Sequence, residues 1–468
     1  MNSIYQKTKR MDFLCFLLII FILTSCEKDN VPPYQTNDVY VMESKERLDP
    51  LTTDLSVNDA LIVANLSKNK FTRSNTAGSV RNVETIFDDN HKPVIYAVNF
   101  EDGYMLISAT RKYYPILAIV DHGSYKCDLN NGAFNLIVKD MIESIKAARD
   151  GNIKESYTNL WSKYVENEKF HSIERKTRSV DDDYWLAFEN WYASVNVNEN
   201  VKIRKLKNCS DVLPENVYQS FTSEAANLDL WEGTTYNWEN TAYVVEETIE
   251  RSNTTGPLLS TKWSQTGTFN TTDYQYLGCV TVAVGQLMRY YEQPSSISWK
   301  DMPDTYGNPT LTNFLAKLRS ELKVSDSGSS NIDNAERVLK SYGYSVDKIK
   351  HDATRIYSSL KQNKPVYARG EDEIGGKGHA WVIDGLYHSE TIIRYTLYHL
   401  SDLAYPQFKY EEVDGGTFEQ YSALTTYHMN WGWKGQNNGW FIDQRPWIME
   451  NGTYTYKFSK DRKELIFK

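Results

Sequence analysis

The stretch that decides the fold is LGCVTVAVGQLMRY, residues 277–290. Its apolar side chains recur at three- and four-residue spacing, which predicts a buried helix with Cys279 in its first turn. That turn leaves backbone N–H groups unpaired and carries the positive end of the helix dipole. Both favour a thiolate, the form of cysteine that attacks carbon, and Gly278 allows the sharp turn into the helix. The alternative is a small buried apolar residue, as most single cysteines are.

Length and composition indicate an ordinary globular protein of more than one domain. The chain has 468 residues, of which 41% are hydrophobic. Its formal net charge is −9 and no long basic run follows residue 30, which argues against nucleic acid as a partner. No Cys/His cluster has the spacing of a zinc site, so no metal is expected. Cys127 and Cys209 are expected either to pair in an oxidising compartment or to remain two buried thiols.

The N-terminus has the pattern of an export signal. Basic residues precede an apolar run over residues 13–23, which has the length of a signal-peptide core and is short for a membrane span. The run ends in LTSC, residues 23–26, which resembles a bacterial lipobox in which Cys26 is lipidated after removal of residues 1–25. The alternative is an ordinary signal peptide with a chance cysteine. We expect a lipoprotein of the cell envelope, in the outer membrane or at the cell surface, with residues 26–50 as a tether.

Residues 51–150 predict a small α+β domain. SVND, residues 56–59, is typical of a helix start. Two strands at residues 94–100 and 104–109, separated by Asp-Gly, predict a hairpin, and residues 115–120 predict a further strand. Residues 134–148 have the pattern of an amphipathic helix. Residues 151–255 are not assigned: their tryptophans argue against simple disorder, and they are either a linker or an extension of the preceding domain.

Three other segments carry residue types that suit a thiol nucleophile. Gln265 precedes Cys279, and a side-chain amide there can donate to an oxyanion together with the Cys279 backbone N–H. GGKGHAWVIDG, residues 375–385, brings His379 on a glycine-rich turn to the start of a strand. Asn430 can accept a hydrogen bond from that imidazole, and Trp431 can cover it. Taken singly, these are a surface glutamine, a structural histidine and an aromatic hairpin.

Together, in the order Cys, His, Asn, these segments resemble the streptopain family of papain-like cysteine peptidases. The resemblance covers residues 257–441, and residues 56–148 resemble the propeptide of that family. It implies an α+β fold, with a papain-like domain of helical and antiparallel β parts over residues 256–468. It also implies a zymogen whose propeptide, residues 51–150, blocks the cleft. The roles that it implies are nucleophile for Cys279, base for His379, oxyanion donor for Gln265, and orienting pair for Asn430 and Trp431.

Flanking residues of the same motifs are expected to shape the substrate cleft or its loops: Gly278, Gly378, Trp381, Gly432 and Trp433. The unmatched segment 151–255 leaves the processing point open, with Arg178 and Arg251 as candidates. An N-terminal lipid would tether the propeptide, so cleavage would free the enzyme unless the propeptide holds on to it.

The expected activity is that of a cysteine endopeptidase without metal or cofactor. Cys279 and His379 would rest as a thiolate–imidazolium pair, and the thiolate would attack the scissile carbonyl to form a thioester. The expected partners are protein or peptide substrates, the chain's own propeptide as inhibitor, and the membrane through the lipid. His428 is a rival base, because it lies two residues before Asn430 on a strand. Two other functions stay open: a transglutaminase-like acyltransferase using Asp384, and an inactive surface-binding lipoprotein.

Overall fold

The computed structural model of the chain describes residues 34–38, 47–49, 51–71, 79–126, 132–152, 157–161, 164–165, 180–195, 201–231, 238–271, 274, 276–371, 378–402, 409–442 and 460–468. Cys26 and the apolar run over residues 13–23 lie outside these ranges, as does Cys127. Within them, no helix has both the length and the apolar character needed to cross a bilayer. Cys209 is a buried free thiol.

The first part of the chain forms a small α+β unit, here called the accessory domain (residues 34–165). Its elements are β1 (Tyr34–Asp38), α2 (Val57–Phe71), β2 (Val80–Phe87), β3 (Pro93–Phe100), β4 (Tyr104–Ser108), β5 (Ile116–Val120), α3 (Gly132–Arg149) and α4 (Thr158–Trp161). The predicted hairpin, third strand and amphipathic helix are confirmed as β3–β4, β5 and α3. The helix start is also confirmed: the Ser56 N–H donates to Asp59 Oδ2 at 2.8 Å, and the Asp59 N–H donates to Ser56 Oγ at 3.3 Å. Strand β1 lies in the segment expected to be a tether, and it pairs with β2.

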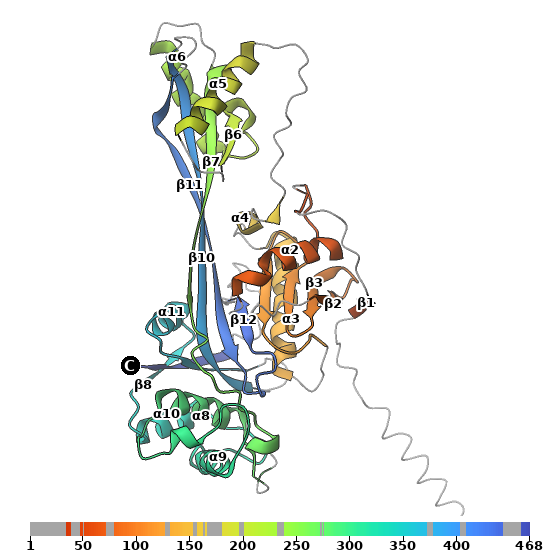
Figure 1. Ribbon diagram of the computed structural model, residues 1–468, viewed down its shortest axis with the longest axis vertical. Coiled ribbons are helices and arrows are strands. Elements are labelled where there is room, and N and C mark those ends of the chain that lie inside the picture. Colours follow the sequence, from red (N-terminus) through yellow and green to blue (C-terminus); the bar gives the residue numbers. More distant parts are fainter. Residues whose placement is uncertain are drawn as a thin grey trace, which may run out of the picture.

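Residues 180–255, which the sequence left unassigned, form ordered elements. These are α5 (Val180–Val195), β6 (Val201–Lys205), η2 (Leu206–Asn208), α6 (Glu215–Trp231), α7 (Trp238–Thr241) and β7 (Ala242–Thr255). These elements pack on the distal halves of two long strands, β10 (Gly378–Asp402) and β11 (Lys409–Asn430). The elements from α5 to β7 are here called the distal lobe. Along β7, Val244 packs with Phe221 of α6 on one face of the sheet, and Val245 packs with Phe188 of α5 on the other. The lobe is therefore a sheet enclosed by two helices (Figure 1).

The rest of the chain forms the core domain (residues 256–468). Its helices are η3 (Gly267–Phe269), α8 (Cys279–Tyr291), η4 (Trp299–Asp301), α9 (Pro309–Glu321), α10 (Ile332–Ser341) and α11 (Ala353–Lys361). Its strands are β8 (Val346–Lys350), β9 (Val366–Glu371), the proximal halves of β10 and β11, β12 (Gly439–Ile442) and β13 (Lys460–Phe467). Asn308 caps α9 by accepting the Leu311 N–H at 2.9 Å, directly before a proline at the first helical position.

One sheet joins the three units. Among the described residues it has 13 strands, in the order β1-β2-β3-β4-β5-β12-β11-β10-β9-β13-β8, with β7 on β10 and β6 on β7. The accessory domain extends this sheet because its β5 pairs with the edge of β12. Figure 1 shows β10 and β11 running from the region of α8, α9 and α10 to the distal lobe, with the accessory domain beside β12. The architecture is α+β, as predicted, with a helical part and an antiparallel β part.

Candidate active site

The helix predicted from residues 277–290 is confirmed as α8, and it begins at Cys279. The residue before it, Gly278, has φ +84°, and a Cβ there would lie 2.7 Å from the Gly328 carbonyl oxygen and 2.8 Å from Val324 Cγ1. Only glycine fits both the backbone angle and the space. The residues from Val280 to Met288 are all buried, so α8 is the central helix of the core domain. Cys279, the candidate nucleophile, therefore lies in the first turn of a helix that the surrounding core holds in place.

The Cys279 thiol is neutral in this structure. Burial raises its pKa, and this outweighs the opposing hydrogen bonds from the backbone N–H groups of Ala380, Val280 and Cys279 itself. The helix N-terminus was expected to favour a resting thiolate. The structure differs because desolvation of the sulfur raises the pKa of Cys279 more than the hydrogen bonds from backbone N–H groups lower it. The contact with the Ala380 N–H places the sulfur beside the third residue of β10.

His379 is held in a cluster of indole rings at the start of β10. Its ring centroid lies 4.8 Å from that of Trp433 and 6.1 Å from that of Trp381. Its Nε2 lies 3.1 Å from the Trp431 carbonyl oxygen. A carbonyl can only accept, so Nε2 carries the hydrogen and Nδ1 is left as the basic nitrogen. Burial lowers the pKa of His379 to about 4, so the imidazole is neutral.

The expected thiolate–imidazolium pair is therefore absent from this state of the chain. His379 is buried, Cys279 is half-buried, both are neutral, and no hydrogen bond between described atoms joins the Cys279 sulfur to the His379 ring. The glycine-rich approach to the histidine, residues 372–377, lies outside the described residues. Gly378, the first residue of β10, pairs with Glu371 of β9.

Asn430 does not accept a hydrogen bond from His379, contrary to expectation. Its Oδ1 accepts from Gln286 Nε2 at 3.2 Å and from the Gly432 N–H at 3.3 Å, and its Nδ2 donates to the Thr261 carbonyl at 2.8 Å. The physical reason is strand alternation: the Asn430 side chain points to α8, whereas the next residue presents its carbonyl to the imidazole. Asn430 thus acts on His379 through the backbone of Trp431, which it holds in place.

Gln286 is a site residue that the sequence reasoning missed. It is fully buried on α8, and its Oε1 accepts the Trp263 N–H at 3.2 Å while its Nε2 donates to Asn430. It therefore ties three chain segments together beneath the histidine. A signal was present: Gln286 is an amide in a mostly apolar run, about two helical turns after Cys279 and hence on the same side of α8.

Gln265 lies beside the helix start. Its carbonyl accepts the Leu277 N–H at 3.1 Å, and its neighbour Ser264 forms a β-bridge with Trp433. Gly432, with φ +73°, packs against Val282 of α8. The backbone thus brings the predicted oxyanion donor next to both the nucleophile and the loop that holds the histidine. The side chain of Gln265 is half-buried.

His428, the rival base, has a different task. Its Nδ1 lies 2.6 Å from Asp384 Oδ1, and its Nε2 lies 3.3 Å from Asp121 Oδ2 of the accessory domain. Burial alone would lower its pKa, but Asp384 and Asp121 overcome that and raise the pKa to about 9. His428 is therefore a charged link between two domains. Asp384 takes part in this link and does not form a triad with His379. A transglutaminase-like acyltransferase that uses Asp384 would require that triad.

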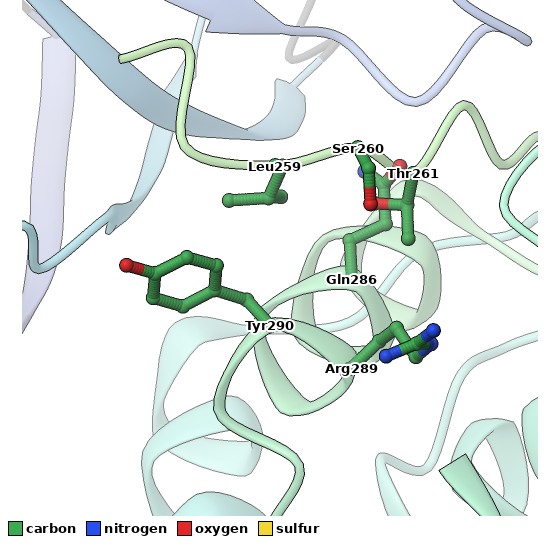
Figure 2. Close-up of a pocket in the computed structure, with 6 residues that line it drawn as sticks. All are labelled: Leu259, Ser260, Thr261, Gln286, Arg289 and Tyr290. Atoms are coloured by element: carbon green, nitrogen blue, oxygen red, sulfur yellow. The ribbon is translucent and has the colours of Figure 1, made fainter. Parts of the chain in front are cut away.

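A small cavity of about 110 Å³ lies farther along α8, beside its C-terminal half. Figure 2 shows Gln286, Arg289 and Tyr290 of that helix facing the segment Leu259, Ser260 and Thr261. It contains neither Cys279 nor His379, so it is not the reaction site. Within the described part of the chain, no group of three or more His, Cys, Asp or Glu residues has the arrangement of a metal site.

Residues 296–441 match the Peptidase C10 family. This span contains His379, Asn430 and Trp431, and it begins after Cys279. The site and this match define the chain as a distant relative of the C10 cysteine peptidases, in agreement with the resemblance seen in its motifs.

The chain is 26% identical over 214 residues to streptopain from Streptococcus pyogenes, covering 35% of this chain and 44% of streptopain. It is also 26% identical over 258 residues to the thiol protease/hemagglutinin PrtT of Porphyromonas gingivalis, covering 44% of this chain and 26% of that protein. The matched region thus spans less than half the length of these curated relatives. A solved fragment of prointerpain A from Prevotella intermedia is similar with a TM-score of 0.41 and 15% identity, over 80% of this chain and 94% of the fragment.

Proposed function

We propose that the protein is a cysteine endopeptidase made as a zymogen, with Cys279 as nucleophile and His379 as base. The observation that carries this proposal is the position of the Cys279 sulfur. It sits at the N-terminus of a buried helix and against the Ala380 N–H, one residue from a histidine whose Nδ1 is free to take a proton. The kinship with C10 peptidases supports the same assignment.

In the active state the thiol proton passes to His379 Nδ1, and the thiolate attacks the scissile carbonyl. The new oxyanion takes hydrogen bonds from the Cys279 N–H and the Gln265 side chain, each donor being worth about 3–4 kcal/mol. His379 then protonates the leaving amine and later activates water to hydrolyse the thioester. The Trp431 carbonyl holds the Nε2–H tautomer throughout, so the same nitrogen serves both steps.

Latency follows from the neutral state of both groups in the full-length chain. The accessory domain is the candidate propeptide, because it docks on β12, the strand that follows the loop holding His379. Activation would then require the contact between β5 and β12 to open.

The test is incubation of full-length protein with casein under reducing conditions, followed on gels and by intact mass. Wild type is expected to shorten itself and to degrade casein. Cys279→Ala is expected to do neither, and His379→Ala should match it. Casein cleavage by Cys279→Ala at the wild-type rate would refute the assignment. Casein untouched by wild type, even after limited trypsin treatment, would instead favour the inactive surface-binding lipoprotein.

We also propose attachment to the cell envelope through a lipid on Cys26. The supporting observation is the sequence of residues 13–26, a short apolar run that ends in LTSC. In bacteria expressing the chain, radiolabelled palmitate is expected to enter the wild-type protein and not Cys26→Ser. Equal label in both would leave only an ordinary signal peptide.

A further inference from the structure

Tyr367 of β9 has a buried hydroxyl that the mechanism above does not use. The residue is fully buried, and its hydroxyl has no hydrogen-bond partner among the described atoms. A buried hydroxyl left unpaired costs about 1–3 kcal/mol, a cost that a phenylalanine of the same shape would not carry. The observation calls for a partner that is present in another state of the site.

The sheet directs Tyr367 toward the nucleophile. Tyr367 pairs with Val382 of β10, and directly opposed residues of an antiparallel pair share one face. On that face Tyr367, Ala380 and Val382 pack in the same apolar cluster as α8, and Cys279 packs against the cluster. The Ala380 N–H also reaches the Cys279 sulfur. The phenol and the thiol therefore belong to the same apolar region, Tyr367 on β9 and Cys279 at the first turn of α8.

The electrostatics agree with this placement. Burial, and after it the neighbouring Cys279, hold the pKa of Tyr367 well above its usual value, while Arg369 acts in the opposite direction. Arg369 is the other charged group that faces this pair, and it is itself paired with Glu371 and Asp461. A phenol with so high a pKa stays protonated at every working pH, so it remains a hydrogen-bond donor.

We propose that Tyr367 is a positioning residue whose hydroxyl donates a hydrogen bond to the Cys279 sulfur once that sulfur is a thiolate. A neutral thiol is a weak acceptor, which accounts for the unpartnered hydroxyl in the resting state. A thiolate is a charged acceptor, and hydrogen bonds to charged groups are the stronger ones. The donor thus favours the reactive form and fixes the direction of its attack. This inference rests on Cys279 as the proposed nucleophile, but its test needs only the thiol.

The experiment is the pH dependence of iodoacetamide alkylation of Cys279 in the full-length chain, read at that cysteine by peptide mass spectrometry. Tyr367→Phe removes only the hydroxyl. It is expected to raise the apparent pKa of Cys279 by about one unit, which slows alkylation about tenfold below that pKa. The thermal midpoint is expected to stay level or rise, because an unpartnered hydroxyl is lost. A merely structural role would move stability and leave the pKa alone.

Tyr291→Phe is the matched control. Tyr291 also has a buried hydroxyl without a partner, but it lies at the far end of α8 and interacts with Tyr290 and Tyr344. Its variant should leave the alkylation profile of Cys279 unchanged. An unchanged or lowered pKa in Tyr367→Phe, or an equal shift in both variants, would overturn the inference.

A second measurement guards against misfolding of the variant. Fluorotyrosine placed at position 367 by codon suppression keeps the ring and makes its hydroxyl a stronger donor. It is expected to lower the pKa of Cys279, and no change would count against the proposal. Failure of the peptidase assignment is recognised separately, because casein cleavage by Cys279→Ala reports on that alone.

Discussion

The accessory domain and the distal lobe both precede Cys279 in the chain, yet they are attached to the core domain in different ways. The accessory domain docks through three β5–β12 residue pairs, from Val120↔Gly439 to Ala118↔Phe441, and its apolar core continues into core-domain residues such as Trp440 and Phe441. The distal lobe is paired with β10 along all 14 residues of β7, from Thr255↔Leu386 to Ala242↔His399. The lobe also has apolar clusters on both faces that mix its own residues with those of β10 and β11.

A region's position before Cys279 in the sequence therefore does not decide whether proteolysis can remove that region from the core domain. The accessory domain shares one strand edge and one apolar cluster with the core domain, whereas β7 cannot leave without exposing apolar clusters on both faces of the lobe. The distal lobe is therefore part of the core unit. A mature chain that begins near residue 256 would lose a strand from the interior of its own sheet, and the predictions below test this contrast.

Limited trypsin digestion should give the largest effect, the loss of one whole domain. We expect cleavage on the N-terminal side of Val180 and a resistant product that contains the distal lobe. Arg251 lies within β7, where strand pairing keeps the backbone out of the protease cleft. Intact mass and N-terminal sequencing check this, and Arg251→Gln should give the same pattern. A stable product starting at residue 252, with the lobe degraded, would contradict it.

Phe188→Ala should produce the next largest effect. Phe188 of α5 is fully buried and stacks on Tyr243 of β7 at 4.4 Å. Truncating a buried phenylalanine costs about 3–5 kcal/mol, and urea unfolding followed by tryptophan fluorescence measures it. Leu186→Ala, on the same helix but 44% exposed, is the control and should stay within about 0.5 kcal/mol. Equal small effects of both variants would mean that α5 is only loosely attached.

Asp121→Asn should weaken the docking of the accessory domain by about 1–2 kcal/mol, because it removes one charged partner of His428 while Asp384 remains. Hydrogen exchange at the amides of β5 and β12 checks this, since protection there reports local opening. Asp102→Asn breaks the exposed ion pair with His122 on the same domain and should change protection by less than about 0.5 kcal/mol. If the two variants behave alike, the buried link does not hold the domains together.

The smallest expected effect near neutral pH is the pH dependence of the docking of the accessory domain. The pKa of His428 is raised from 6.5 to about 9, so its stabilising contribution is fully present below pH 6.5 and is lost as pH rises through about 9. Protection in β5 and β12 should therefore fall between pH 8 and 10, beyond the general acceleration of exchange with pH. His428→Gln should lack this step. A step of equal size in that variant would assign it to another group.

The sequence predicted well what local patterns determine. The start of α8 at Cys279, the Asp-Gly hairpin and α3 follow from helical spacing, turn chemistry and amphipathicity over a few residues. It did not predict the distal lobe, because the C-terminal half of β7 is polar and becomes a strand only by pairing with residues more than a hundred positions away. The link from Asp121 to His428 spans 307 positions, and the tie from Gln286 to Asn430 spans 144, so neither leaves a local signal beyond the polar residue itself.

The edge contact between β5 and β12 has a consequence for how inhibition would end. While the chain is intact, the two strands face each other at the high effective concentration that a covalent connection provides. Once the connection is cut, the same contact becomes an ordinary complex with a dissociation constant, and its occupancy depends on how much protein is present. Cleavage of the chain and release of the core domain would then be separate events, and dilution would favour release.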